Sequence, residues 1–188
     1  MPRAGLSPAG VVDAALALID EQGPEALTLS AVAVRTGVAT PSLYKHVRNI
    51  SELRTLIAQR VMEEMTDLVG TAVMGRGGPE AVIALMRVWR RYAVEHPFRY
   101  AAMPPAPLID PALAEAGGRL LEVVLAVLRG CGLEGGAAVH TARCLRAAVH
   151  GFAVLEVAGG FGLSEDLDTS YRLLEKTIVD GLLPAEND

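Results

Sequence analysis

Apolar residues recur at helical spacing along most of the chain, and short segments rich in glycine or proline separate these stretches. Near the start, apolar side chains occupy the positions i, i+3, i+4 and i+7 of a helix: Val12, Ala15, Leu16 and Ile19. The last stretch carries one apolar stripe, formed by Leu167, Tyr171, Leu174, Ile178 and Leu182. No segment shows the alternation of apolar and polar residues that is typical of a strand. The pattern therefore predicts an all-α fold.

Residues that favour helix starts and helix ends divide the chain into about nine helices. The predicted ranges are 8–22, 29–36, 40–48, 50–69, 79–96, 98–103, 111–131, 136–158 and 165–182. Ser7, Asp110 and Ser164 are the expected N-caps of the first, seventh and ninth helices. Asn49-Ile50-Ser51-Glu52 has the form of a capping box that opens the fourth helix. We predict a three-helix domain over residues 1–50, linked through the helix 50–69 to a helical regulatory and dimerisation domain over residues 51–188.

Residues 37–48 have the pattern of a tight turn between two short helices. Gly37 ends the first helix, because glycine adopts a positive φ without a steric penalty. Thr40 supplies a capping hydroxyl and Pro41 suits the first helical position. The second helix then presents polar and basic groups that can hydrogen-bond DNA, namely Tyr44, Lys45, His46 and Arg48. The segment therefore predicts a helix-turn-helix with a DNA-recognition helix.

The segment from Ala26 to Asn49 resembles the DNA-binding domain of TetR-family transcriptional regulators, whose most recognisable element is the Leu43-Tyr44-x-His46 core. The resemblance implies a double-stranded DNA operator as partner. It also implies that Tyr44 and His46 bind backbone phosphate, and that base edges are contacted by Thr40, Pro41, Ser42 and Lys45. The full set of candidate DNA-binding residues is Thr28, Ser30, Thr40, Pro41, Ser42, Tyr44, Lys45, His46 and Arg48.

Two positions depart from the family pattern. Family members often carry a basic residue near the start of the second helix, where this chain has Ser30-Ala31. They also often carry a lysine just past the recognition helix, where this chain has Ile50. Both departures predict fewer contacts to phosphates or bases, so the operator sequence and affinity of relatives do not transfer.

Charge is distributed unevenly along the chain, whose net charge is −5. Residues 1–60 hold six Lys and Arg against five Asp and Glu, whereas the remainder holds eleven against seventeen. Basic groups therefore concentrate around the predicted recognition helix, and the acidic remainder is expected to repel DNA.

An effector pocket in the second domain follows from a further resemblance. Trp89, Phe98, Tyr100 and the pair His150-Gly151 are similar to the subgroup of this family whose regulatory domain is named for its Trp, His and Gly. Aromatic and methionine side chains with a few polar groups suit a small, mainly apolar ligand. The candidate lining residues are Met62, Met65, Trp89, Tyr92, Phe98, Tyr100, Met103, Leu121, Cys144 and His150. The alternative interpretation assigns these residues to the plain core.

Gly151 lies inside a predicted helix, where glycine costs about 1 kcal/mol relative to alanine. We therefore expect a partner helix or a ligand to approach it closely. The resemblance implies a homodimer in which the last two helices of each protomer form a four-helix bundle. The candidate interface combines the final stripe with Ala147, Ala148, Gly151, Val154, Leu155 and Ala158. Alternatively, both helices cover only their own core.

Other chemistry finds little support in the sequence. The chain has no Gly-rich phosphate loop, His-Glu-x-x-His motif, nucleophile elbow or clustered His/Cys/Asp set, so we expect no enzyme activity, catalytic residue, metal or cofactor. Cys131 and Cys144 are expected to be reduced, buried thiols. No hydrophobic signal region and no apolar run of membrane-spanning length is present, which predicts a soluble cytoplasmic protein without membrane contact.

Together these observations predict a homodimeric repressor that a small, mainly apolar effector releases from a palindromic operator. Two alternatives stay open. One is a transcriptional activator of the same family, and the other is a helical ligand-binding or interaction protein that binds no operator.

Overall fold

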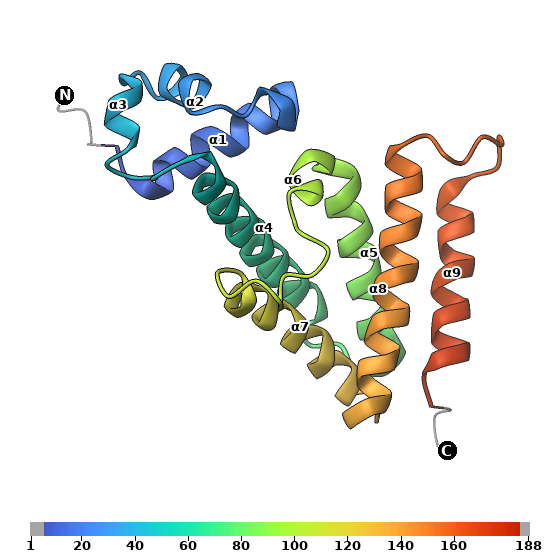
Figure 1. The fold of residues 1–188 in the computed structure, drawn as a ribbon. Coiled ribbons are helices and arrows are strands. Elements are labelled where there is room, and N and C mark those ends of the chain that lie inside the picture. Colours follow the sequence, from blue (N-terminus) through green and yellow to red (C-terminus); the bar gives the residue numbers. More distant parts are fainter. Residues whose placement is uncertain (1–5, 185–188) are drawn as a thin grey trace. The chain divides into compact units, whose positions relative to one another are not determined.

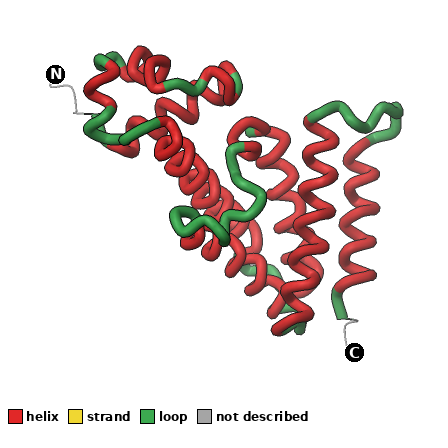
Figure 2. Tube along the Cα trace, in the orientation of Figure 1, coloured by secondary structure: helices red, strands yellow, loops and turns green. Residues whose placement is uncertain are grey.

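The computed structural model describes residues 6–184 and confirms the all-α prediction (Figure 1). Within these residues, helices and loops are present and strands are absent (Figure 2). The elements are α1 (Pro8–Gln22), the 3-10 turn η1 (Pro24–Ala26), α2 (Leu29–Thr36), α3 (Thr40–Leu43), α4 (Ile50–Val73), α5 (Gly78–Glu95), α6 (Pro97–Ala101), α7 (Ala114–Arg129), α8 (Gly135–Val157) and α9 (Leu167–Leu182). Nine α-helices thus lie in the described part of the chain, as predicted.

The chain divides into two compact units. The first combines Met1–Met62 with Phe98–Gly117, and the second combines Glu63–Pro97 with Gly118–Asp188. The long helix α4 contributes residues to both units.

The first unit has a core formed by α1 to α3 and the start of α4. Ser7 caps α1, since its Oγ accepts a hydrogen bond from the Gly10 N–H at 3.1 Å. The apolar face of α1 is buried, as its i, i+3, i+4 spacing predicts. The residues that pack in this core include Val11, Val12, Ala15, Leu16, Ile19, Val32, Ala33, Leu43, Val47, Leu53 and Ile57.

Residues 98–117 belong to the same unit through several contacts. The Arg99 guanidinium donates to the Asp20 carboxylate on α1, with a shortest distance of 2.6 Å. On α4, the Gln59 side chain donates to the Ala112 carbonyl at 2.6 Å. A small apolar cluster completes the attachment and contains Ala58, Met62, Leu113 and Ala116, with Met103 packed against it.

The second unit is built around α5, which packs against α8 and α9. The buried Tyr171 hydroxyl of α9 donates to the Met86 carbonyl of α5 at 2.7 Å. Glu175, also on α9 and buried, accepts two hydrogen bonds from Arg87 of α5 at 2.7 and 2.8 Å. Apolar packing and paired polar groups therefore fix α9 to α5.

Two helix starts expected in the C-terminal half of the chain are wrong. The last helix is capped by Asp166, whose carboxylate accepts from the Thr169 N–H at 2.8 Å, and Ser164 lies outside the helix. The helix expected from residue 111 begins at Ala114, because residues 111–113 form a turn in which Asp110 accepts from the Ala112 N–H. The segment before the last helix offers several capping side chains, and spacing alone did not single out Asp166.

Candidate nucleic-acid interface

The turn between α2 and α3 is fixed by backbone hydrogen bonds around Gly37. Its φ of +69° places it in the left-handed region, where the Val38 N–H reaches the Ala33 carbonyl and the Gly37 N–H reaches the Val34 carbonyl. A Cβ added to Gly37 would meet no atom within 4 Å. Glycine is therefore favoured here for its backbone conformation and not for space.

The recognition segment is less helical than predicted. The α-helix α3 covers only Thr40–Leu43, and Ala39 occupies its N-cap in place of the expected Thr40. Tyr44, Lys45 and His46 follow in a turn, in which the His46 N–H donates to the Leu43 carbonyl at 2.8 Å. A turn with bonds between residues i and i+3 is tighter than an α-helix. The predicted helix over residues 40–48 is thus corrected to one helical turn and a tight continuation.

Buried residues hold this segment while its polar residues face outward. Leu43 and Val47 are fully buried, and between them Tyr44 is 56% exposed. None of the nine candidate DNA-binding residues is buried. Six of them are exposed (Thr28, Ser30, Pro41, Tyr44, Lys45 and Arg48), and three are half-buried (Thr40, Ser42 and His46). Thr28 also caps α2, since its Oγ1 accepts from the Ala31 N–H at 3.1 Å.

Most arginines of the first unit are paired with carboxylates, which the sequence count of charges did not reveal. The pairs are Arg35 with Glu21, Arg48 with Glu52, Arg60 with Asp13 and Arg99 with Asp20, with N–O distances from 2.5 to 3.0 Å. The hydrogen bond from Arg35 lowers the pKa of Glu21 below its ordinary value. The expected concentration of basic groups is therefore largely neutralised within the unit.

Glu52 has two roles at the start of α4. Its carboxylate accepts the backbone N–H of Arg48 and also the Arg48 Nε at 3.0 Å, and the backbone bond contributes most to lowering the pKa of Glu52. The Asn49 Oδ1 in turn accepts from the Glu52 N–H at 2.9 Å. This arrangement matches the expected capping box, with the carboxylate reaching one residue further back. The Arg48 side chain remains 84% exposed beside it.

One cation that the sequence reasoning did not select is prominent in the structure. Arg54 on α4 is exposed, and among the described residues it has no hydrogen-bond or ion-pair partner. The signal in the sequence was the absence of an acidic residue three or four positions away on either side.

The candidate effector residues are distributed over both units. Met62, Phe98, Tyr100 and Met103 belong to the first unit, and the others belong to the second. Five are buried: Met62, Met65, Trp89, Tyr92 and Tyr100. Met103 and Leu121 are half-buried, whereas the structure places Phe98, Cys144 and His150 on the surface. The expectation of two buried thiols is wrong, since Cys144 is exposed and Cys131 is half-buried.

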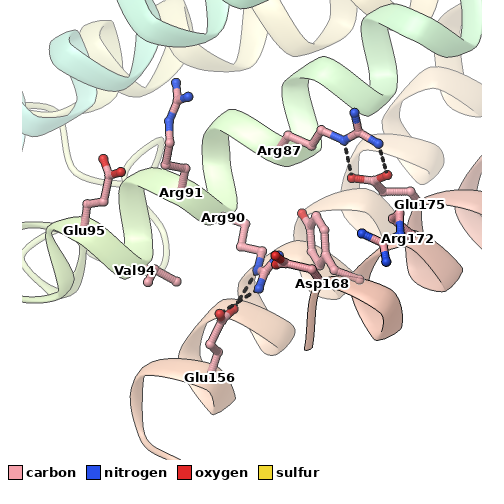
Figure 3. Close-up of a pocket in the computed structure, with 10 residues that line it drawn as sticks. Arg87, Arg90, Arg91, Val94, Glu95, Glu156, Asp168, Arg172 and Glu175 are labelled. Atoms are coloured by element: carbon pink, nitrogen blue, oxygen red, sulfur yellow. Dashed lines mark hydrogen bonds and ion pairs between the residues drawn. The ribbon is translucent and has the colours of Figure 1, made fainter. Parts of the chain in front are cut away.

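A groove of about 610 Å³ lies within the second unit, and none of the candidate effector residues lines it (Figure 3). Its walls come from α5, α8, α9 and the residues around them, namely Arg87, Arg90, Arg91, Val94, Glu95, Glu156, Asp168, Tyr171, Arg172 and Glu175. The Arg90 guanidinium donates to Glu156 at 2.6 Å and to Asp168 at 2.7 Å, and these bonds raise its pKa. It also lies over the rings of Tyr171 and Phe152. These paired groups tie three helices together.

The predicted dimer surface is only partly available in the chain. Tyr171 and Ile178 of the α9 stripe are buried within their own unit, so these two side chains are not available to a partner. Leu167, Leu174 and Leu182 of the same stripe are half-buried. The α8 side is different. Val154 and Leu155 are exposed, and a Cβ added to Gly151 would meet no atom within 4 Å. The chain itself therefore gives no packing reason for glycine at this position.

Other site chemistry is not evident in the described residues. No group of three or more His, Cys, Asp or Glu side chains there is placed to hold a metal ion. Across residues 6–184, helices that are both long and apolar enough to cross a membrane are likewise absent.

Two family models match this chain. The model described as "Bacterial regulatory proteins, tetR family" matches residues 11–55, and the model described as "Tetracyclin repressor-like, C-terminal domain" matches residues 82–178. The second interval contains Trp89, His150 and Gly151. The chain belongs to the TetR family of transcriptional regulators, which are DNA-binding proteins.

Individual relatives agree with this assignment. The chain is 35% identical over 168 residues to the uncharacterized HTH-type transcriptional regulator Rv0681 of Mycobacterium tuberculosis, covering 88% of this chain and 76% of that protein. It is 30% identical over 133 residues to the HTH-type transcriptional repressor DrrR1 of Streptomyces coeruleorubidus, covering 70% and 47%. The fold is similar to that of ActR from Streptomyces coelicolor in complex with (S)-DNPA, with a TM-score of 0.70, 23% identity and coverage of 95% and 98%.

Proposed function

We propose that this protein is a homodimeric repressor that binds a palindromic operator and is released by a small, mainly apolar effector. In this proposal residues 1–50 bind DNA, and residues 51–188 bind the effector and the second protomer. The helix 50–69, the first part of α4, connects these two functions.

The observation that carries the proposal is the recognition segment. Gly37 turns the chain, the buried Leu43 and Val47 anchor the segment, and the polar side chains between them remain accessible. We assign Tyr44 and His46 to phosphates, and we assign four residues to base edges: Thr40, Pro41, Ser42 and Lys45. Thr28 and Ser30 would support these contacts from the first turn of α2. Arg48, whose side chain bonds Glu52 through Nε and is 84% exposed, would join them through its remaining N–H groups.

Effector binding and repression are supported by the descriptions of similar proteins and by the buried side chains of the second unit. DrrR1 is named a repressor, and ActR was solved with a small molecule bound. The second unit of this chain buries Met65, Trp89 and Tyr92, which are adaptable or aromatic side chains suited to an apolar ligand. The Tyr92 hydroxyl donates to Glu64 at 2.8 Å and would give such a site one polar group.

Release requires two states of the dimer. Two recognition segments related by a two-fold axis must reach successive major grooves, which are ~34–36 Å apart. We propose that the effector favours a dimer in which this spacing is lost, with α4 transmitting the change. The effector shifts the equilibrium only by its differential affinity for the two states.

Selection of bound duplexes from a genomic library tests the function. We expect enrichment of a sequence with two symmetric half-sites, which retards in a mobility-shift assay and is displaced by its unlabelled copy but not by a scrambled duplex. Failure to enrich any sequence would contradict operator binding. If transcription of a reporter rises when the protein binds upstream of it, the protein is an activator and not a repressor.

A further inference from the structure

Few cations of the first unit are available to a phosphate. In Arg35, Arg60 and Arg99 the guanidinium is engaged by a carboxylate at 2.8 Å or less. Arg48 donates both its backbone N–H and its side-chain Nε to Glu52, so that carboxylate balances part of its charge. Among the described Lys and Arg of the unit, only Lys45 and Arg54 have no such partner. Lys45 already belongs to the recognition segment.

Arg54 is close in sequence to that segment. It lies seven residues after the buried Val47 and in the second turn of α4, four residues and about 6 Å along the axis from Ile50. Side chains on an α-helix lean toward its N-terminus, so Arg54 extends back over the first turn, toward the end that follows the recognition segment. That first turn supplies no free cation of its own, because Ile50 and Ser51 are uncharged and Glu52 is acidic.

The backbone at Arg54 is held in place by packing, while its guanidinium is available to bind a phosphate. The preceding Leu53 is fully buried in the core and holds this turn of α4 in place. Arg54 itself is exposed and forms no hydrogen bond or ion pair with a described residue. A guanidinium on a rigid helix can form two parallel hydrogen bonds to phosphate oxygens.

We propose that Arg54 binds an operator phosphate next to the recognition segment. Among the described residues of each protomer, Arg54 and Lys45 then supply most of the salt-dependent part of the affinity for DNA. This inference rests on the proposed operator binding. It places a phosphate contact on the second turn of α4, in a chain that lacks the lysine that relatives often carry at the position of Ile50.

The expected effect of losing Arg54 on the salt dependence of DNA binding follows from counterion release. Each phosphate contact contributes about 0.9 to the slope of log affinity against log salt. A dimer that loses Arg54 from both protomers should therefore have a slope shallower by about 1.8. Between 50 and 200 mM salt, its loss of affinity should be about 12-fold smaller than that of the wild type.

The test uses fluorescence anisotropy with the full chain and two duplexes: one recovered by selection with the wild type, and one of random sequence. Arg54→Gln should bind both duplexes more weakly and with the shallower slope, because a phosphate contact does not depend on sequence. Arg54→Lys should keep the wild-type slope. Arg91→Gln is the matched control, since Arg91 is exposed on α5 in the second unit and has no partner among the described residues. It should bind like the wild type.

The outcomes separate this inference from the proposed function. If the wild type binds the selected duplex and Arg54→Gln has the same affinity and slope, the role of Arg54 is excluded while operator binding stands. An equal change in Arg91→Gln would also exclude it, because the effect would then come from net charge. If the wild type binds neither duplex, the proposed function fails and the inference fails with it.

Discussion

Gly151 offers a sensitive probe of the proposed dimer. It lies well inside α8, and its added Cβ would meet nothing within 4 Å in the same chain. Replacing it with alanine should therefore favour the helix of the single chain by about 1 kcal/mol. If a partner helix packs against this position, the methyl group that alanine adds would clash with that helix in the dimer.

The two contributions can be separated. The gain in helix propensity is present in both the folded monomer and the dimer, so it cancels from the dissociation constant. Overpacking of a close contact costs about 1–3 kcal/mol, and a two-fold interface contains the position twice. The dimer of Gly151→Ala should then be weaker by at least about 2 kcal/mol, which raises the dissociation constant roughly 30-fold.

Sedimentation equilibrium over a range of protein concentrations measures this constant, and thermal unfolding measures the gain in the chain. Gly70→Ala in α4 is the matched control, because Gly70 is helical and its added Cβ also meets open space. It should raise Tm by roughly 2–4 °C per kcal/mol gained without altering dimerisation. If Gly151→Ala dimerises like the wild type and is stabilised like Gly70→Ala, no partner approaches Gly151 and the α8 surface is not the interface.

Two further comparisons test the corrected details of the fold. Asp166→Ala should lower the free energy of unfolding in urea by about 1 kcal/mol, because α9 loses its N-cap. Ser164→Ala should leave this free energy unchanged. Equal effects of the two substitutions would contradict the assignment of Asp166 as the N-cap. Ile178→Asp buries an unpaired carboxylate at a position 7% exposed and should cost at least about 2 kcal/mol, whereas Leu173→Asp, at 63% exposure, should stay within about 0.5 kcal/mol by the same measurement. A well-folded Ile178→Asp variant would place that side chain outside the core.

The sequence predicted the elements whose signals are local. The cap of α1 at Ser7, the turn at Gly37 and the apolar stripe of α9 each depend on residues within a few positions of one another. The N-terminal Leu43-Tyr44-x-His46 core identified the family for the same reason. Local chemistry was sufficient for the fold class and for the family.

Ion pairs between residues that lie far apart in the sequence could not be predicted in this way. Arg35 and Glu21 are 14 positions apart and Arg60 and Asp13 are 47 apart, so a count of charges treated them as independent. The direction of the α9 stripe was equally undetermined, because a helix packs the same apolar face against its own core or against a partner. The length of α3 also escaped prediction, since capping residues mark where a helix begins but not how many turns it keeps.

The central claim, that the exposed residues of the recognition segment bind DNA, is tested most directly by a double variant, Tyr44→Phe with His46→Ala. Leu43 and Val47 still anchor the segment in this variant, and a circular dichroism spectrum like that of the wild type would confirm that the fold is kept. Each lost hydrogen bond to a charged phosphate is worth roughly 1.5 kcal/mol or more. The affinity for the selected duplex should therefore fall more than about tenfold in a mobility-shift titration. A double variant that binds this duplex with wild-type affinity would contradict the assignment of the recognition segment.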